Sequence, residues 1–268
     1  MSTEIRSSGS NAYDDEQHSP IDVYATKVRE WAEKIPIGMG LCPWAGKSNN
    51  KGLLRVVTCI CDAPNNAAEM IEREVELLSR EGTPPLSTTL IVCPHVPMWK
   101  KFQTFDEFVR IGFKRQLKKS EVLDNVTLVA FHPDFLRWHG LPEGVGVGSE
   151  VKSLWGMIGQ KSLQTATATI IETNNKAFGL RKVKIRFDNI LEGRQQQQYV
   201  PIDWLDLSEI GPPLPDNFVY RAPYPTIHII ANQDLASMRI CDVSKVKRLN
   251  ASRMAKRGWE GLDAGYTG

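Results

Sequence analysis

The 268-residue sequence contains no apolar run close to the about 18 residues that a membrane-spanning helix requires. It also lacks an excess of either charge, because 33 Lys and Arg residues nearly balance 31 Asp and Glu residues, for a net charge of +2. Bulk charge therefore favours neither a nucleic-acid partner nor a membrane surface. With 41% hydrophobic residues, the chain has the composition of a soluble globular protein that buries a core without disulfide bonds.

Several familiar catalytic motifs are also missing from the sequence. It contains no P-loop, no G-x-S-x-G and no H-E-x-x-H, and Gly144-Val-Gly-Val-Gly148 does not follow a predicted strand as a dinucleotide-binding loop would. The five cysteines include no C-x-x-C pair, which argues against a zinc ribbon or a thioredoxin motif. We expect reduced thiols, typical of the cytoplasm, and we expect Cys59, Cys61 and Cys93 to be core residues.

The two ends of the chain are predicted to be unstructured. The first twenty residues hold four acids and one arginine, without the basic start and apolar core of a secretory signal. They are also too acidic for a transit peptide. We therefore expect residues 1–20 to be a disordered acidic tail, residues 263–268 to be a flexible C-terminus, and the protein to be cytoplasmic.

The first half of the sequence alternates between helical and strand-like patterns. This alternation predicts the α/β (or α+β) class, with a helix-covered, mostly parallel or mixed sheet of about four to six strands. The expected elements are a helix from Tyr24 to Ile35 that ends before Pro36, a loop over Leu41–Gly52, a strand over Leu53–Cys61, a helix capped by Asn65 or Asn66, a strand over Thr88–Cys93, a helix opened by a capping box at Thr104–Glu107, and a strand over Val126–Phe131.

The stretch 140–217 has a different character, with clustered glycines, four consecutive glutamines and a Gly-Pro-Pro-Leu-Pro run. We interpret residues 21–262 as a single α/β domain that this partly ordered surface insertion interrupts, with Val183–Phe187 as a strand candidate inside it. Arg221–Ile230 returns to a strand-like pattern. Asp242 is predicted to cap a final helix that ends at Gly258, whose cations are more typical of a solvated face than of a nucleic-acid site.

Cys42 is the first candidate for chemistry. It lies in a glycine-bearing loop next to Pro43, and Lys47, Lys51 and Arg55 follow closely. Nearby cations favour the thiolate form of a cysteine, which is the form that attacks electrophiles and binds metals. Two interpretations stay open at this point. Cys42 is either a nucleophile or metal ligand, or a small buried residue that packs a corner between helix and loop.

Two further segments carry unusual polar residues. His132 follows a predicted strand, and ligands of open α/β sheets bind at the carboxyl ends of strands, although a histidine that caps backbone carbonyls fits equally well. Arg221, Tyr224 and His228 lie on a proline-stiffened extended segment that places Tyr224 and His228 on one side. Arg221 offers a bidentate fork for a carboxylate or phosphate, and the alternative is a structural ion pair beside a tyrosine packed on proline.

Several pieces of the sequence resemble one known family, the uncharacterised bacterial and eukaryotic proteins catalogued as domain of unknown function 1415. Compact members run almost directly from a His-Pro turn to an Arg-x-Pro-Tyr-Pro segment, so the resemblance implies that residues 140–217 are an insertion. The matching pieces are Gly40-Leu-Cys-Pro-Trp-Ala45 with Lys51, Gly52 and Arg55, then Thr88–Val92, Ala130-Phe-His-Pro133, Arg221–His228 and Gly258–Leu262.

Two positions depart from the family pattern. Tyr220 stands where an asparagine commonly precedes the arginine, and Ala231-Asn232 stands where an Arg-Glu pair commonly follows the histidine. If that pair binds substrate, the resemblance implies a different substrate or a loss of activity. The family supplies motif identity and no reaction.

The leading hypothesis is an enzyme that acts on a small anionic metabolite, with a cysteine nucleophile, a histidine general base and cationic or polar groups that bind the substrate. A variant of it has zinc held by one cysteine and two histidines with an open position. The alternative is a non-catalytic ligand-binding or assembly protein. The proposed catalytic residues, which are also the candidate zinc ligands, are Cys42, His132 and His228, and the proposed substrate-binding residues are Arg221, Tyr224, Lys51 and Arg55. Each catalytic version requires Cys42, His132 and His228 to lie around one cavity.

Overall fold

The structure is a computed structural model that describes residues 20–113, 125–138, 140–155, 164–177, 180–188, 196–207, 215–236, 249–254 and 256. The predicted tail up to residue 19, the predicted C-terminus 263–268, and the start and end of the predicted final helix lie outside these residues, as does Cys241.

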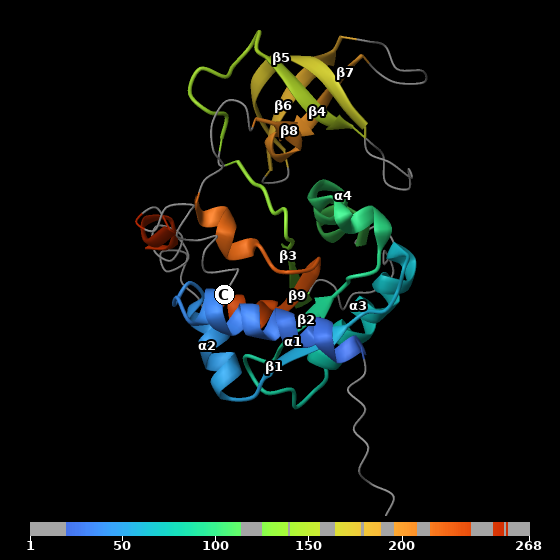
Figure 1. Ribbon diagram of the computed structural model, residues 1–268, viewed down its shortest axis with the longest axis vertical. Helices are drawn as coiled ribbons and strands as arrows, with labels where there is room; N and C mark the ends of the chain where they lie inside the picture. The colour runs from blue at the N-terminus through green and yellow to red at the C-terminus, as the bar shows by residue number, and fades with distance from the viewer. Residues whose placement is uncertain are drawn as a thin grey trace, which may run out of the picture.

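Two β-sheets organise the described residues, and Figure 1 shows them at different ends of the molecule. The first sheet has the strand order β1-β2-β9-β3, in which β1 and β2 pair in parallel and β9 pairs antiparallel with both of its neighbours. This mixed sheet with helices confirms the predicted class. The strands are β1 (Leu54–Thr58), β2 (Thr88–Val92), β3 (Val126–Phe131) and β9 (Thr226–Ala231).

Helices cover both faces of the first sheet. Because side chains alternate along a strand, Leu90 and Phe131 face α1 (Pro20–Ala32) and α2 (Pro43–Asn50), in a cluster that includes Val28 and Trp31. Ile91, Ile227 and Ile229 face the other way, onto Ile71 and Val75 of α3 (Pro64–Leu78) and Phe105 of α4 (Phe102–Glu107). The sheet thus forms the middle layer between two sets of helices.

The sequence-based helix boundaries need two corrections near the N-terminus. The first helix does not end before Pro36 but continues as a π-helical turn over Glu33–Ile37. Pro36 lies inside this turn, and its carbonyl oxygen accepts the N–H group of Leu41 at 2.9 Å. The predicted loop Leu41–Gly52 contains α2, whose first residue is Pro43, a position where the missing N–H costs nothing.

Two predicted helix caps are also wrong. The helix α3 begins at Pro64, with Ala63 rather than Asn65 or Asn66 at the N-cap position. The helix α4 begins at Phe102, so Thr104 lies inside it and forms no capping box. Phe102, the first residue of this helix, is only 1% exposed. A π-helical turn over Phe108–Gly112 follows.

The described residues of the stretch 140–217 form a second unit of regular structure. It contains a wholly antiparallel second sheet of order β7-β6-β5-β4-β8, and β6 confirms the strand candidate Val183–Phe187. This sheet has its own buried cluster, which includes Ile170, Val183 and Ile185. Its strands are β4 (Glu150–Trp155), β5 (Gln164–Ala177), β6 (Leu180–Phe187), β7 (Gln197–Pro201) and β8 (Leu205–Asp206).

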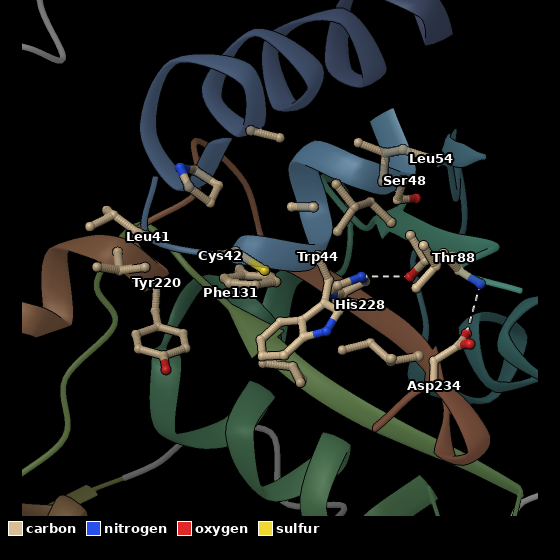
Figure 2. A pocket seen from close by; sticks show the side chains of 18 of the residues that line it. Leu41, Cys42, Trp44, Ser48, Leu54, Thr88, Phe131, Tyr220, His228 and Asp234 are labelled. Atoms are coloured by element: carbon tan, nitrogen blue, oxygen red, sulfur yellow. Dashed lines mark hydrogen bonds between the residues drawn. The ribbon is translucent and has the colours of Figure 1, made fainter. Parts of the chain in front are cut away.

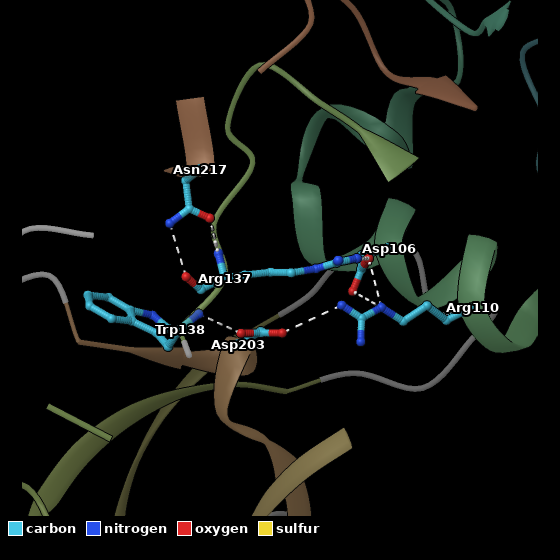
Figure 3. Close-up of polar contacts among 6 residues, drawn as sticks. All are labelled: Asp106, Arg110, Arg137, Trp138, Asp203 and Asn217. Atoms are coloured by element: carbon cyan, nitrogen blue, oxygen red, sulfur yellow. Dashed lines mark hydrogen bonds and ion pairs between the residues drawn. The ribbon is translucent and has the colours of Figure 1, made fainter. Parts of the chain in front are cut away.

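A polar network joins the second sheet to the first part of the chain (Figure 3). The outgoing and returning segments are linked by two hydrogen bonds between Arg137 and Asn217, of 2.8 and 3.0 Å. Asp203 accepts the backbone N–H of Trp138 at 2.7 Å and lies 3.5 Å from the guanidinium of Arg110. Asp106 of α4 pairs with both Arg110 and Arg137, so the junction is fixed by charges from both parts.

Candidate functional site

A cavity of about 340 Å³ lies between the N-terminal helices and one face of the first sheet (Figure 2). Residues of α1, α2 and the loop between them line one side, among them Trp31, Cys42 and Ser48. The opposite side is the sheet, which contributes alternate residues of all four strands because only one face looks toward the helices. The strand residues in the lining are Leu54, Thr88, Leu90, Val129, Phe131, His228 and Ile230.

Cys42 borders this cavity as the N-cap residue of α2. Its backbone N–H donates to Pro36 O at 3.0 Å, so the π-helical turn fixes its position. Gly40 turns the chain just before it with a φ of +62°, which glycine adopts without strain. The side chains of Asn250 and Arg253 donate to the carbonyls of Leu41 and Gly40 at 2.8 and 2.7 Å, which secures this turn from a distant part of the chain.

The thiol of Cys42 is in the protonated form at neutral pH. Burial raises its pKa, and the backbone N–H groups of Ala45 and Trp44 at the start of α2 only partly oppose that effect. Lys47, Lys51 and Arg55 have exposed side chains, and none of the three is among the groups that shift the pKa of Cys42, so the predicted lowering by these cations is not seen. Cys42 is therefore a half-buried thiol rather than a ready thiolate.

His228 reaches the same cavity from β9, and its hydrogen bonds fix its tautomer. Thr88 Oγ1 lies 2.6 Å from both His228 Nε2 and the carbonyl oxygen of Ile229. A carbonyl only accepts, so the Thr88 hydroxyl donates to Ile229 and accepts the Nε2–H of His228. Nδ1 consequently holds a lone pair. Burial lowers the pKa of His228 to about 4, so the ring is neutral at physiological pH.

The remaining lining is mainly apolar and carries two polar atoms that have no hydrogen-bond partner within the described part of the chain. These atoms are Trp31 Nε1 and Ser48 Oγ, both buried. The described lining residues include no Lys or Arg. An unpaired buried donor is costly, so such atoms indicate where a polar group of a ligand would bind.

One rim of the cavity is formed by the segment before β2 and by α6 (Asn232–Ala236). Asp234 accepts the backbone N–H of Leu86 at 3.1 Å, which ties the two elements together. Leu86 has a φ of +73°, a strained conformation for a residue with a side chain. The carboxylate of Asp234 thus holds a strained backbone at the edge of the cavity.

His132 does not reach the cavity, which corrects the predicted common site. It is 1% exposed and lies against the rings of Phe102 and Phe105 on the other side of the sheet. Its Nε2 lies 2.8 Å from Trp99 O, and its Nδ1 accepts the backbone N–H of Asp134 at 2.9 Å. Both nitrogens are satisfied, so the ring acts as the structural cap that the alternative interpretation described.

The four predicted substrate-binding residues also lie outside the cavity lining. Arg221 Nε points to the carbonyl of Phe135 at 3.5 Å, and Arg55 pairs with Glu74 of α3 at 3.1 Å. Tyr224 packs edge-on against Tyr24, with ring centroids 5.0 Å apart. Lys51 is the exposed C-cap residue of α2. Of the seven predicted site residues, Cys42 and His228 share the cavity.

This geometry corrects the zinc variant of the hypothesis as well. Cys42 and His228 lie on one side of the sheet and His132 on the other, so the three do not surround one point. Across all the residues that the structure describes, no group of three or more His, Cys, Asp or Glu side chains is placed to hold a metal ion.

Sequence reasoning missed Trp31, Ser48, Thr88 and Asp234 as cavity residues. Trp31 lies inside the helix predicted from Tyr24 to Ile35, but a helical pattern does not show which side chain lines a cavity. Thr88 lies opposite Ile230 on β9, next to His228, and this register joins residues that are about 140 positions apart. No local pattern shows such a pairing.

Comparisons with known proteins agree with part of this account. No helix in the described residues is long and apolar enough to cross a membrane.

A search of curated proteins and a search of solved structures each gave no significant match. Residues 23–141 match a family model, and this range includes most of α1 together with α2, β1, β2 and β3, but neither the second sheet nor β9. Over residues 23–141 the chain is thus similar to the family described as protein of unknown function (DUF1415).

Proposed function

We propose that this protein binds a small, mainly apolar and uncharged molecule in the cavity between α1, α2 and the first sheet. The observation that carries the proposal is the cavity itself, about 340 Å³ in volume, with a mainly apolar lining and two buried polar atoms that have no partner among the described residues. Ligand sites are commonly apolar cavities of about 300–1,000 Å³ with a few polar groups that orient the ligand. This cavity is near the small end of that range, which suits a compact ligand.

The polar atoms specify which groups the ligand would carry. Trp31 Nε1–H is a donor only, so it calls for an acceptor such as a hydroxyl or carbonyl oxygen. His228 Nδ1 is an acceptor in the fixed tautomer, so it matches a donor. We propose an uncharged rather than an anionic ligand, because Arg221, Lys51 and Arg55 lie outside the described lining and the rim carries the acidic Asp234.

The experiment compares two aromatic probes of similar shape by isothermal titration calorimetry. We expect 1-naphthol, which is neutral and has one hydroxyl group, to bind at least tenfold more tightly than 1-naphthoate. Val129→Phe places a ring in the cavity from β3 and should abolish binding of 1-naphthol. Val147→Phe, at a position that is 68% exposed in the loop before β4, is the matched control and should bind normally. If both variants bind 1-naphthol equally well, the cavity is not the binding site and the proposal is wrong.

A second candidate function is thiol chemistry on the bound molecule, and the position of Cys42 favours it. The sulfur contacts two backbone N–H groups at the start of α2, which stabilise a thiolate once it forms, and His228 Nδ1 offers a lone pair in the same cavity. The test is alkylation of Cys42 by iodoacetamide at pH 7 and pH 9, with and without 1-naphthol. If Cys42 is catalytic, iodoacetamide should alkylate it at pH 7 faster than it alkylates a free thiol. If Cys42 only packs the corner between helix and loop, its alkylation should be slower than that of a free thiol.

The proposal places the protein in the cytoplasm with reduced thiols. In the structure the four described cysteines, Cys42, Cys59, Cys61 and Cys93, are free of disulfide bonds. A reducing compartment is the environment in which such thiols persist.

A further inference from the structure

Three cysteines come together at one edge of the first sheet, away from the cavity. Cys59 directly follows β1 and Cys93 directly follows β2. These two strands are parallel neighbours with Thr58 opposite Val92, and the ladder continues because Cys59 N donates to Val92 O at 2.7 Å. Cys59 and Cys93 are therefore opposite each other on strands about 4.8 Å apart. That spacing falls within the roughly 4.4–6.8 Å between Cα atoms that a disulfide bond requires.

The side chains of this cluster are in contact. The sulfur of Cys59 interacts with the thiols of Cys93 and Cys61, and the Cys93 thiol also donates to Ile91 O at 3.9 Å. These two thiols lower the pKa of Cys59 to about 6, and Arg73 adds a smaller effect in the same direction. Burial and the neighbouring Cys59 raise the pKa of Cys61 to about 11, and Cys59 together with burial raises that of Cys93 well above its ordinary value. These shifts favour a thiolate at Cys59 over one at Cys61 or Cys93 at neutral pH.

The cluster lies just beneath the surface. Cys59 and Cys93 are 1% and 0% exposed. Cys61 is half-buried, and Ile60, which separates Cys59 from Cys61 in the sequence, is 63% exposed. Both buried cysteines belong to the hydrophobic cluster of α3 and α4, on the opposite side of the sheet from the cavity. The inference that follows is consequently independent of the proposed function.

We propose that Cys59 and Cys93 are a redox-sensitive pair that a hydroperoxide converts into a disulfide bond across β1 and β2. The Cys59 thiolate attacks the hydroxyl oxygen of the peroxide, the O–O bond breaks, and Cys59 becomes a sulfenic acid. The leaving group is hydroxide from hydrogen peroxide, which protonation converts to water, or an alkoxide from an alkyl hydroperoxide, which protonation converts to an alcohol. The sulfur of Cys93 then attacks the resulting sulfenic acid, the S–O bond breaks, and the Cys93 proton leaves with the oxygen as water. Two thiols lose two electrons, and the peroxide gains them.

Cys93 is the partner that this geometry selects. A bond between Cys59 and Cys61 would close a ring across a single intervening residue, whereas Cys93 lies opposite Cys59 without any change of strand pairing. Cys61 instead serves as the half-exposed donor that keeps the charge on Cys59. It is a positioning residue for the reaction.

The test treats the reduced full-length protein with hydrogen peroxide at pH 7 and maps its disulfide bonds by mass spectrometry under non-reducing conditions. We expect a loss of two hydrogen masses, one linked peptide pair that contains Cys59 and Cys93, and reversal by dithiothreitol. Cys42→Ser should give the same yield. In Cys93→Ala, dimedone should trap the sulfenic acid at Cys59, and the wild-type map decides the question if this variant does not fold.

Other results would overturn the proposal. One is oxidation confined to Cys61, Cys42 or Cys241 while circular dichroism shows a folded protein. Another is a Cys59–Cys93 bond that forms only after the protein has unfolded. The pH dependence adds a further readout, because the oxidation rate should be half-maximal near pH 6 and not near the pH 9 that an ordinary thiol gives.

Discussion

Thr88 Oγ1 lies 2.6 Å from His228 Nε2, and this contact joins β2 to β9 on the face that lines the cavity. The threonine gives its own proton to Ile229 O, so it accepts the proton of the imidazole. The histidine is thereby held as one neutral tautomer with its second nitrogen unprotonated. The chemistry of the cavity depends on this contact more than on any motif in the sequence.

The first prediction concerns the pH dependence of stability. His228 has a pKa of about 4 in the folded protein and 6.5 when unfolded, so between these values the unfolded chain binds the proton and the folded protein does not. The free energy of unfolding should therefore fall as the pH drops from about 6.5 to about 4, by up to about 3 kcal/mol. Urea unfolding at pH 7 and at pH 4.5 measures this difference in the free energy of unfolding.

His228→Gln is the control for this prediction. It removes the titrating group but retains His132, whose pKa burial also lowers and which contributes acid sensitivity of its own. The variant should lose less stability than the wild type between the two pH values. An equal loss would mean that His228 is hydrated and titrates normally.

The second prediction separates Thr88 from its neighbour Thr89. Thr88→Val leaves the buried Nε2–H of His228 without an acceptor and should cost about 1–3 kcal/mol, while freeing the imidazole to change tautomer. Thr89→Val removes a buried hydroxyl on the opposite face, where it contacts Glu74 at 3.3 Å, and should leave the tautomer unchanged. Nitrogen chemical shifts of the His228 ring report the tautomer in each variant. Unchanged shifts in Thr88→Val would contradict the assignment.

The third prediction uses the unpartnered hydroxyl of Ser48. Because Ser48 Oγ is buried and has no hydrogen-bond partner among the described residues, Ser48→Ala should leave the unfolding free energy unchanged or raise it by up to about 1 kcal/mol. The matched control is Thr226→Val, which removes a buried hydroxyl that donates to Tyr224 O at 2.8 Å and should cost about 1 kcal/mol. Clear destabilisation by Ser48→Ala, measured by urea unfolding, would show that the hydroxyl is already satisfied.

The fourth prediction concerns the junction between the two sheets. Asp203→Ala removes both the acceptor of Trp138 N and the partner of Arg110, whereas Asp203→Asn retains an oxygen for Trp138. We expect amide hydrogen exchange around residues 137–138 to accelerate in the alanine variant, with a smaller change in the asparagine variant. Identical exchange in the wild type and Asp203→Ala would show that the connecting hydrogen bonds with Asn217 hold the junction alone.

Local patterns in the sequence were sufficient for some elements and not for others. Val126–Phe131 was predicted with the bounds that β3 has, because its apolar run stands between clear breaks. The short helix α2 was missed, since it has weak amphipathic character and its main signal is a proline at the first position. The place of β9 between β2 and β3 depends on contacts between distant segments, which a local pattern does not contain.

The same limit applies to the candidate site. His132 and His228 look alike in the sequence, since each belongs to a strand or follows one and lies near prolines. Only the three-dimensional contacts show that both nitrogens of His132 are satisfied while His228 faces a cavity. Sequence reasoning identified Cys42 and His228 as residues of interest but grouped them with side chains on other faces of the fold.

The central claim, that the cavity takes up a small neutral molecule, is tested most directly by the indole N–H signal of Trp31 in a ¹H–¹⁵N spectrum, assigned with Trp31→Phe. In the free protein this donor has no partner in the described structure. We predict that 1-naphthol shifts the signal downfield in a saturable way and slows its exchange with water, because the hydroxyl oxygen accepts the hydrogen bond. A signal that does not move at saturating 1-naphthol, while the protein remains folded, would contradict the account.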